Sequence, residues 1–158
     1  MTTAIAQKTN VEAKWNTQKI QEEASGAFAR MWMASLKTVE TMGPEGIKML
    51  AKHVAESKMN YYKSMNVKTP IDLVKAIAEF ETNVFGSKIQ IWGDDTKAHL
   101  DYQVCGCFDA FTKMGKDPKK EEIMGQVCSM SNEIFAKEMG MKVEMKMGEP
   151  LCTMTFSK

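Results

Sequence analysis

The hydrophobic period of this chain changes after Gly86, and this change restricts the folds that the chain can adopt. Before Gly86, apolar residues recur every three or four positions, which is typical of helices with one buried face. After Gly86, two segments alternate apolar and polar residues around a turn, which is typical of β-hairpins. With 158 residues, the chain has the length of one domain.

Three helices are predicted before the change of period. Pro44 suits the first turn of the second helix, and Thr69 with Asp72 forms a capping box that begins the third. The predicted helices span 11–41, 44–65 and 69–85. The predicted buried face of the second helix consists of Ile47, Leu50, Val54, Tyr61 and Met65. Residues 1–10 lack a period and are predicted to form a flexible arm before a single domain over 11–158.

The remaining elements are two hairpins with helices between them. The hairpins are predicted over 89–104 and 141–156, with a short helix over 108–114 and a long helix over 118–139. Each hairpin has one apolar face that must be covered. The predicted fold is therefore α+β, with a four-stranded antiparallel sheet and about four long helices packed on it.

Charge and hydropathy restrict the partners. The net charge of +1 gives no electrostatic reason to bind nucleic acid. No stretch approaches the roughly 18 apolar residues of a membrane helix, and the N-terminus lacks the pattern of a signal peptide. We therefore expect a cytoplasmic protein with neither nucleic acid nor a membrane as its partner. Homodimerisation through the N-terminal helices is a further hypothesis.

The common catalytic motifs are absent from the sequence, so the four cysteines carry most of the chemical signal. Cys105 and Cys107 flank Gly106 where a strand gives way to a helix, and a helix N-terminus favours the thiolate form. Cys105 is thus a candidate nucleophile. The alternative is that both are small, half-buried residues of a tight turn.

The other two cysteines lie on apolar faces, and each is interpreted either as core or as chemistry. Cys128 lies on the fourth long helix, and Cys152 on the last strand. Packing the helix on the sheet would bring them together, and a Zn or Fe site with the ligands Cys105, Cys107, Cys128 and Cys152 is one hypothesis. Strand parity opposes it, because Cys105 shares the phase of the polar residue Gln103 unless the strand ends early.

Two further sets of residues are candidates. His99 and Asp101 lie on one strand face and could transfer protons, or they could simply be solvated. The chain has 15 methionines, which fill apolar positions with flexible thioethers. They indicate either an ordinary core or a small-molecule pocket between the sheet and the helices. The candidate ligand-binding residues are Met124, Phe135, Met145, Met154 and Phe156.

The C-terminal part resembles the L-2-amino-thiazoline-4-carboxylic acid hydrolase-like family. The resemblance covers about a third of the chain. Four segments carry it: Tyr102-Gln103-Val104-Cys105, Phe111-Thr112-Lys113-Met114-Gly115, Cys128, and Gly148-Glu149-Pro150-Leu151-Cys152-Thr153-Met154-Thr155-Phe156. The plan is also similar to that of the 4-vinyl reductase small-molecule-binding domain.

The resemblance implies functions of two classes. Cys105, Cys128 and Cys152 match the family's three cysteine positions, and Cys107 is additional. Ser131 stands where the family often has an acid. The first implied function is hydrolytic opening of a sulfur-containing ring, with Cys105 as nucleophile and His99 or Asp101 as general base. The second is binding of a small molecule or a metal without turnover, as in a sensor or accessory domain.

Overall fold

The computed structural model describes residues 13–115, 117–148 and 151–158. Its elements, in chain order, are α1 (Thr17–Ser64), α2 (Pro70–Phe85), β1 (Lys88–Gly93), β2 (Lys97–Val104), α3 (Gly106–Lys113), α4 (Pro118–Glu138), β3 (Lys142–Met147) and β4 (Cys152–Ser157). They confirm the predicted α+β class. The predicted arm at 1–10 and part of the predicted turn before Cys152 lie outside the described residues.

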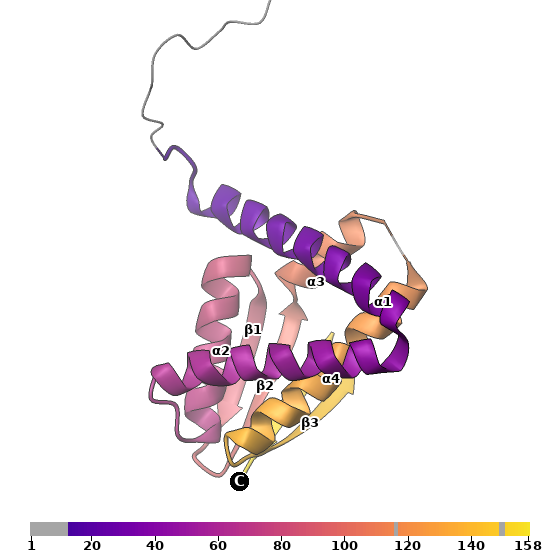
Figure 1. Cartoon of the computed structure of the whole chain (residues 1–158). Helices are drawn as coiled ribbons and strands as arrows, with labels where there is room; N and C mark the ends of the chain where they lie inside the picture. Colours follow the sequence, from indigo (N-terminus) through magenta and orange to yellow (C-terminus); the bar gives the residue numbers. More distant parts are fainter. Residues whose placement is uncertain (1–12, 116, 149–150) are drawn as a thin grey trace, which may run out of the picture.

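The first two predicted helices are the two halves of α1. Gly43 has φ 67° and ψ −157°, a conformation that breaks the helix, and Pro44 follows it. The kink turns the chain back on itself (Figure 1). The helix begins at Thr17 and not near Val11, because the side chain of Asn16 caps it by accepting a hydrogen bond of 2.9 Å from Lys19 N.

The two hairpins form one antiparallel sheet with the strand order β1-β2-β4-β3. The central pair β2–β4 joins them, with Leu100 opposite Met154 and Ala98 opposite Phe156. These side chains are buried on one face of the sheet, which we call the inner face. The opposite, outer face carries the alternate residues of each strand.

The helices cover the inner face. α2 packs on β1 and β2, α4 packs on β3, and α1 lies across α2, α3 and α4 (Figure 1). Buried side chains form two clusters. The sheet-side core lies between the inner face, α2, α4 and the second half of α1. The helical core lies among α1, α3 and α4. The second half of α1 therefore belongs to both clusters, through Ala55 in the first and Ala51 in the second.

Candidate functional site

The turn between β2 and α3 directs Cys105 toward the sheet-side core. The strand ends at Val104, and Cys105 is the N-cap of α3, where its Sγ accepts a hydrogen bond of 3.5 Å from Phe108 N. Gly106 lies so close to α2 that an added Cβ would be 1.9 Å from the Phe85 carbonyl oxygen. This close approach requires glycine. It fixes the end of the strand and removes the parity objection, since Cys105 packs against the core.

Ser87 connects this turn to a partly buried carboxylate. Its hydroxyl accepts a hydrogen bond of 3.1 Å from Gly106 N and donates one of 3.1 Å to Glu81 Oε2. Ser87 is only 2% exposed. Burial raises the pKa of Glu81, while Ser87 and the positive charge of Lys58 oppose that rise. Glu81 is therefore held in one orientation, with a carboxyl group that keeps its proton to higher pH than an exposed one.

Lys58 on α1 is the cationic residue of the same region. Its Nζ donates a hydrogen bond of 2.9 Å to Asn132 Oδ1 on α4. Asn132 is 8% exposed, and its Nδ2 lies 3.5 Å from Met145 Sδ on β3. Loss of hydration lowers the pKa of Lys58, and the charges of Cys128 and Glu81 oppose that change.

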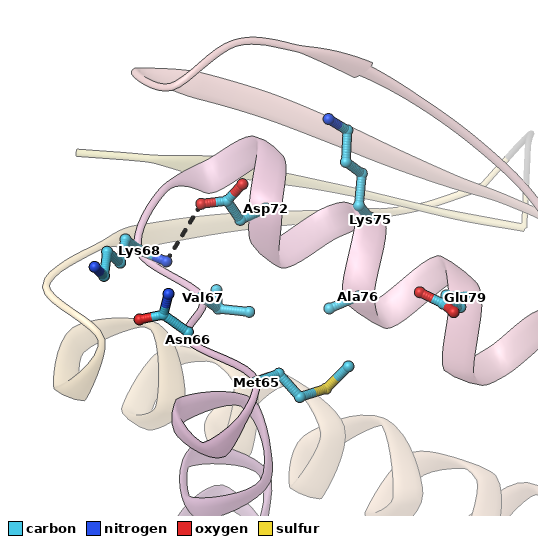
Figure 2. A pocket seen from close by; sticks show the side chains of 8 residues that line it. All are labelled: Met65, Asn66, Val67, Lys68, Asp72, Lys75, Ala76 and Glu79. Carbon is cyan, nitrogen blue, oxygen red and sulfur yellow. Dashed lines mark hydrogen bonds between the residues drawn. The ribbon is translucent and has the colours of Figure 1, made fainter.

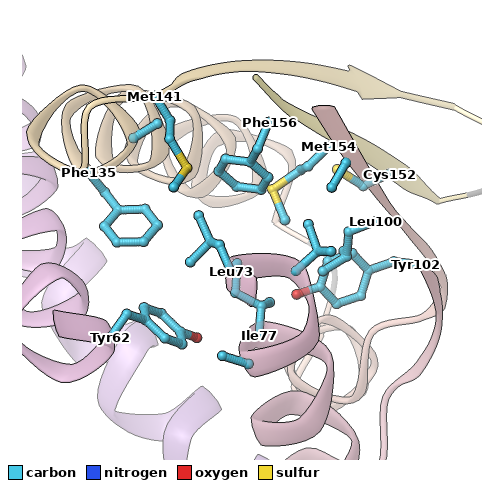
Figure 3. Packing of buried hydrophobic residues seen from close by; sticks show 14 of the residues in the cluster. Tyr62, Leu73, Ile77, Leu100, Tyr102, Phe135, Met141, Cys152, Met154 and Phe156 are labelled. Carbon is cyan, nitrogen blue, oxygen red and sulfur yellow. The ribbon is translucent and has the colours of Figure 1, made fainter. Parts of the chain in front are cut away.

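The charge of Glu81 reaches ionisable groups from four other elements. It raises the pKa of Tyr62, Tyr102, Cys105, Cys107 and Cys128. The two tyrosines point their hydroxyl groups toward one another across Ile77 (Figure 3). Cys152 feels the charge of Cys128. We call this set the inner polar cluster: Lys58, Tyr62, Glu81, Ser87, Tyr102, Cys105, Cys107, Cys128, Asn132 and Cys152.

All four thiols are shifted toward the neutral form. Burial is the largest cause for each, and it raises the pKa of Cys105 and of Cys152 to about 11. The pKa values of Cys107 and Cys128 are raised as well. For Cys105, burial outweighs the hydrogen bonds from Phe108 N and Cys107 N, which favour the thiolate. The thiolate character expected at this helix N-terminus is therefore not found.

The cysteines do not converge as metal ligands. Over 13–115, 117–148 and 151–158, no three His, Cys, Asp or Glu side chains are grouped so that they could hold a metal ion. All four cysteines are free thiols. The expected Zn or Fe site of Cys105, Cys107, Cys128 and Cys152 is thus not seen among the described residues, and it stays a prediction.

His99 and Asp101 lie on the outer face of the sheet, on the side opposite to Leu100 and Tyr102. His99 stacks on Trp92 with 4.9 Å between ring centroids, and its Nδ1 lies 3.0 Å from Thr155 Oγ1. Asp101 Oδ1 is buried without a hydrogen-bond partner among the described residues. The strand's own alternation therefore separates both side chains from Cys105, for which they were the expected general bases.

The predicted ligand-binding residues are divided between the two cores. Phe135, Met154 and Phe156 are buried in the sheet-side core (Figure 3), and Met145 packs against it. Met124 packs against the helical core instead. These residues thus do not line one common surface, and their role toward a ligand stays a prediction.

A hollow of about 400 Å³ lies elsewhere, at the connection between α1 and α2 (Figure 2). Met65, Asn66, Val67, Lys68, Asp72, Lys75, Ala76 and Glu79 line it. None of the predicted site residues is among them. Asp72 is already engaged in the cap of α2, where it accepts hydrogen bonds from Lys68 N and Thr69 N.

Sequence reasoning missed Lys58, Glu81 and Asn132, although helical phase could have found them. Lys58 lies three residues after Ala55 and four before Tyr62, both of which are buried. Glu81 likewise follows the buried Ile77 by four positions, and Asn132 precedes the buried Phe135 by three. The signal is a charged or amide side chain three or four positions away from buried residues of the same helix. The predicted buried face of the second helix was wrong at Tyr61 and Met65, which are exposed.

Comparison with known proteins adds no assignment. No protein-family model matches the chain, and no curated protein matches it. Among the helices of the described residues, none has the length and apolar character needed to cross a membrane.

Proposed function

We propose that the protein is a hydrolase-like small-molecule protein of the thiazoline-carboxylate type, with its site at the inner polar cluster. The observation that carries this proposal is the gathering of Lys58, Glu81 and four thiols around one partly buried region. Buried ionisable groups with shifted pKa values are costly to a fold and concentrate at functional sites. The sequence resemblance, which includes Cys105, Cys128 and Cys152, supports the same region.

In this proposal, Glu81 and not a thiolate activates the nucleophile. Glu81 accepts a proton from a water molecule, and its raised pKa makes it a stronger base than an exposed carboxylate. The water oxygen bonds to the ring carbon next to sulfur, the carbon–sulfur bond breaks, and the sulfur takes the proton. Lys58 stabilises the negative charge that develops, and the neutral thiols form a soft wall for the ring sulfur.

The second candidate is binding of a small molecule without turnover, as in a sensor or accessory domain. The neutral state of the four thiols favours it, because a thiol with a pKa of about 11, as at Cys105, is a poor nucleophile at neutral pH. The same cluster would then provide recognition alone.

Turnover of 2-amino-thiazoline-4-carboxylate distinguishes the two functions. We expect the wild-type protein to release a free thiol product, detected by mass spectrometry, and Glu81→Gln to abolish release. Glu79→Gln, a change of the same kind at an exposed position of the same helix, serves as the control. Binding detected by a raised melting temperature, with no product, would establish the second candidate. If the protein shows no binding and forms no product, both candidate functions are contradicted.

Two further expectations belong to this proposal. A reducing, cytoplasmic location accords with four free thiols. Homodimerisation through the first half of α1 accords with its exposed apolar side chains, since Ile20 is 51% and Met31 73% exposed. Sedimentation of the wild-type protein and of Met31→Glu tests the dimer: a wild type that sediments as a monomer excludes it.

A further inference from the structure

The first half of α1 carries a second, largely apolar stripe on the side that faces away from the core. Its six members follow one another at spacings of four and three residues, which is the spacing of positions a and d in a coiled coil. None of the six is buried. We call them the outer seam: Ile20, Ala24, Ala27, Met31, Ala34 and Thr38.

The fold turns the outer seam toward solvent. The buried residues of this half-helix lie roughly half a turn around the helix from the seam, and they are Ser25, Ala29, Leu36 and Val39. The half-helix itself lies at the edge of the molecule (Figure 1). Gly43 ends the stripe, because the chain turns back there. The seam is therefore an exposed helix face about 27 Å long, at 1.5 Å per residue.

The side chains of the seam alternate in size, which suits another helix. Ile20 and Met31 project into solvent, with exposed fractions of 51% and 73%. The three alanines between and beside them are small, and small residues let two helix axes approach to the short end of the usual range of about 8–10 Å. A second helix fits this face when its small residues lie opposite Ile20 and Met31. A second copy of the same helix meets that condition only when it runs in the opposite direction, because a parallel copy places Met31 opposite Met31.

The flanks of the seam favour the same direction. One flank is charged and the other is neutral: Glu23, Arg30 and Lys37 form the first, and Gln21, Phe28 and Ser35 form the second. In an antiparallel pair each flank meets its own copy, so Glu23 faces Lys37 of the second copy twice and the two Phe28 rings meet near the axis. In a parallel pair the charged flank meets the neutral one, and Glu23 would lie against Phe28. Charge complementarity therefore selects the antiparallel pair.

Arg30 is the one residue of the charged flank that would meet its own copy at the centre. A Cβ added at Gly26 would lie 3.3 Å from Arg30 Nη1, so the guanidinium lies over Gly26, on the side away from the seam. This orientation keeps the two guanidinium groups apart. Glu23 accepts a hydrogen bond from Lys19 through Oε1, and its second oxygen, Oε2, is the acceptor that we assign to Lys37 of the second copy.

We propose that two copies of the chain pair antiparallel along the outer seam, with the twofold axis at the level of Ala29. This register gives each member a partner of matching size: Ala24 with Ala34, Ala27 with Met31, and Ile20 with Thr38 of the second copy. The inference rests on the homodimer of the proposed function and adds its direction, its register and its ion pairs.

Disulfide cross-linking of the full chain tests the direction and the register. Under mild oxidation by copper phenanthroline, Ala24→Cys/Ala34→Cys should form a covalent dimer on a non-reducing gel, because the two thiols face one another across the antiparallel pair. Neither single variant should do so, and nor should Ala27→Cys, whose thiol faces Met31. The wild type, with its four free thiols, is the control. A covalent dimer of Ala27→Cys would show a parallel pair and overturn the inference, as would a double variant that does not cross-link.

Reversal of charge tests the ion pairs. By sedimentation equilibrium, Glu23→Lys and Lys37→Glu should each raise the dissociation constant of the dimer roughly 3- to 10-fold, because each turns two attractive pairs into two repulsive ones. The double variant should return close to the wild-type value, and Lys52→Glu, on the other half of α1, should leave it unchanged. A double variant as weak as the single ones would overturn the inference.

The outcomes separate this inference from the proposed function. A wild type that sediments as a monomer contradicts the dimer and its geometry, and thiazoline turnover by that monomer leaves the proposed hydrolase standing. A dimer that cross-links through Ala27→Cys contradicts the antiparallel geometry alone. An antiparallel dimer without turnover or binding supports this inference and contradicts the proposed activity.

Discussion

The ionisable residues on the two sides of the sheet lie in different surroundings. On the outer face, His99 stacks on Trp92 and bonds Thr155, in side chains that are all partly or fully exposed. On the inner side, burial raises the pKa of Glu81 and of all four thiols and lowers that of Lys58. The difference shows that residue type alone is a poor guide to a site. The His-Asp pair looks catalytic in the sequence, but Lys58, Glu81 and the four thiols lie on the other side of the sheet.

The largest expected contrast is in packing. Phe156→Ala on the inner face should lower the free energy of unfolding by about 3–5 kcal/mol, because it leaves a cavity around a fully buried ring. Thr155→Ala, the neighbouring change on the outer face, should cost less than about 1 kcal/mol. Urea denaturation measures both. Similar losses for the two variants would mean that the faces are not distinguished by burial.

Thiol labelling should give the next largest contrast. A pKa of about 11 at Cys105, against an ordinary value of 9.0, reduces the thiolate fraction near pH 8, so alkylation should be about 100-fold slower than for an unperturbed thiol. Iodoacetamide labelling followed by mass spectrometry measures the rate. A cysteine introduced on the outer face by Thr153→Cys serves as the reference. Labelling of Cys105 as fast as this reference would show that burial does not hold its proton.

The pH dependence of stability should separate Glu81 from a surface carboxylate. The pKa of Glu81 is raised above 4.5, so its contribution is fully present below that value and is lost as pH rises through the folded-state pKa. Glu81→Gln should therefore gain stability relative to wild type as pH rises. Asp94 has a pKa lowered by bonds from Thr96 and Lys97, so its contribution is lost as pH falls. Asp94→Asn should show the opposite trend, and matching trends would refute the distinction.

The smallest effect is expected from the pair that looked catalytic. His99→Ala removes a stack and one hydrogen bond on a partly exposed face, so it should change the free energy of unfolding by about 1 kcal/mol or less. It should also leave labelling of Cys105 unchanged, because the two side chains lie on opposite sides of β2. A changed labelling rate at Cys105 would indicate that His99 and Cys105 belong to one site.

The fold was predictable because its signals are local. The capping box of Thr69 and Asp72 forms as expected, with the Thr69 hydroxyl accepting from Asp72 N. Alternation in both hairpins correctly predicts the inner face. The site was less predictable, because it depends on contacts between distant segments. The end of β2 depends on the close approach of Gly106 to Phe85, and no period in the sequence encodes that contact.

The composition of the buried face of α1 explains why Lys58 was missed. Tyr61 and Met65 were predicted to lie on the buried face of α1 because their side chains are large and apolar, although both are exposed. The true buried face there consists of small residues, Ala51 and Ala55, with Tyr62. Small residues admit close packing by neighbouring helices and give a weak hydropathy signal. Lys58 lies three positions after Ala55 and four before Tyr62, in the phase of this buried face, and sequence reasoning missed it.

The strand order has a consequence for synthesis on the ribosome. β4 pairs with both β2 and β3, so it lies inside the sheet although it is made after every other described element. Until Cys152–Ser157 have emerged, β2 and β3 both lack β4, the strand that pairs with each of them. The helices then have only an incomplete sheet to pack on. Chaperone dependence should accordingly be greatest in the interval between the emergence of β2 and that of β4.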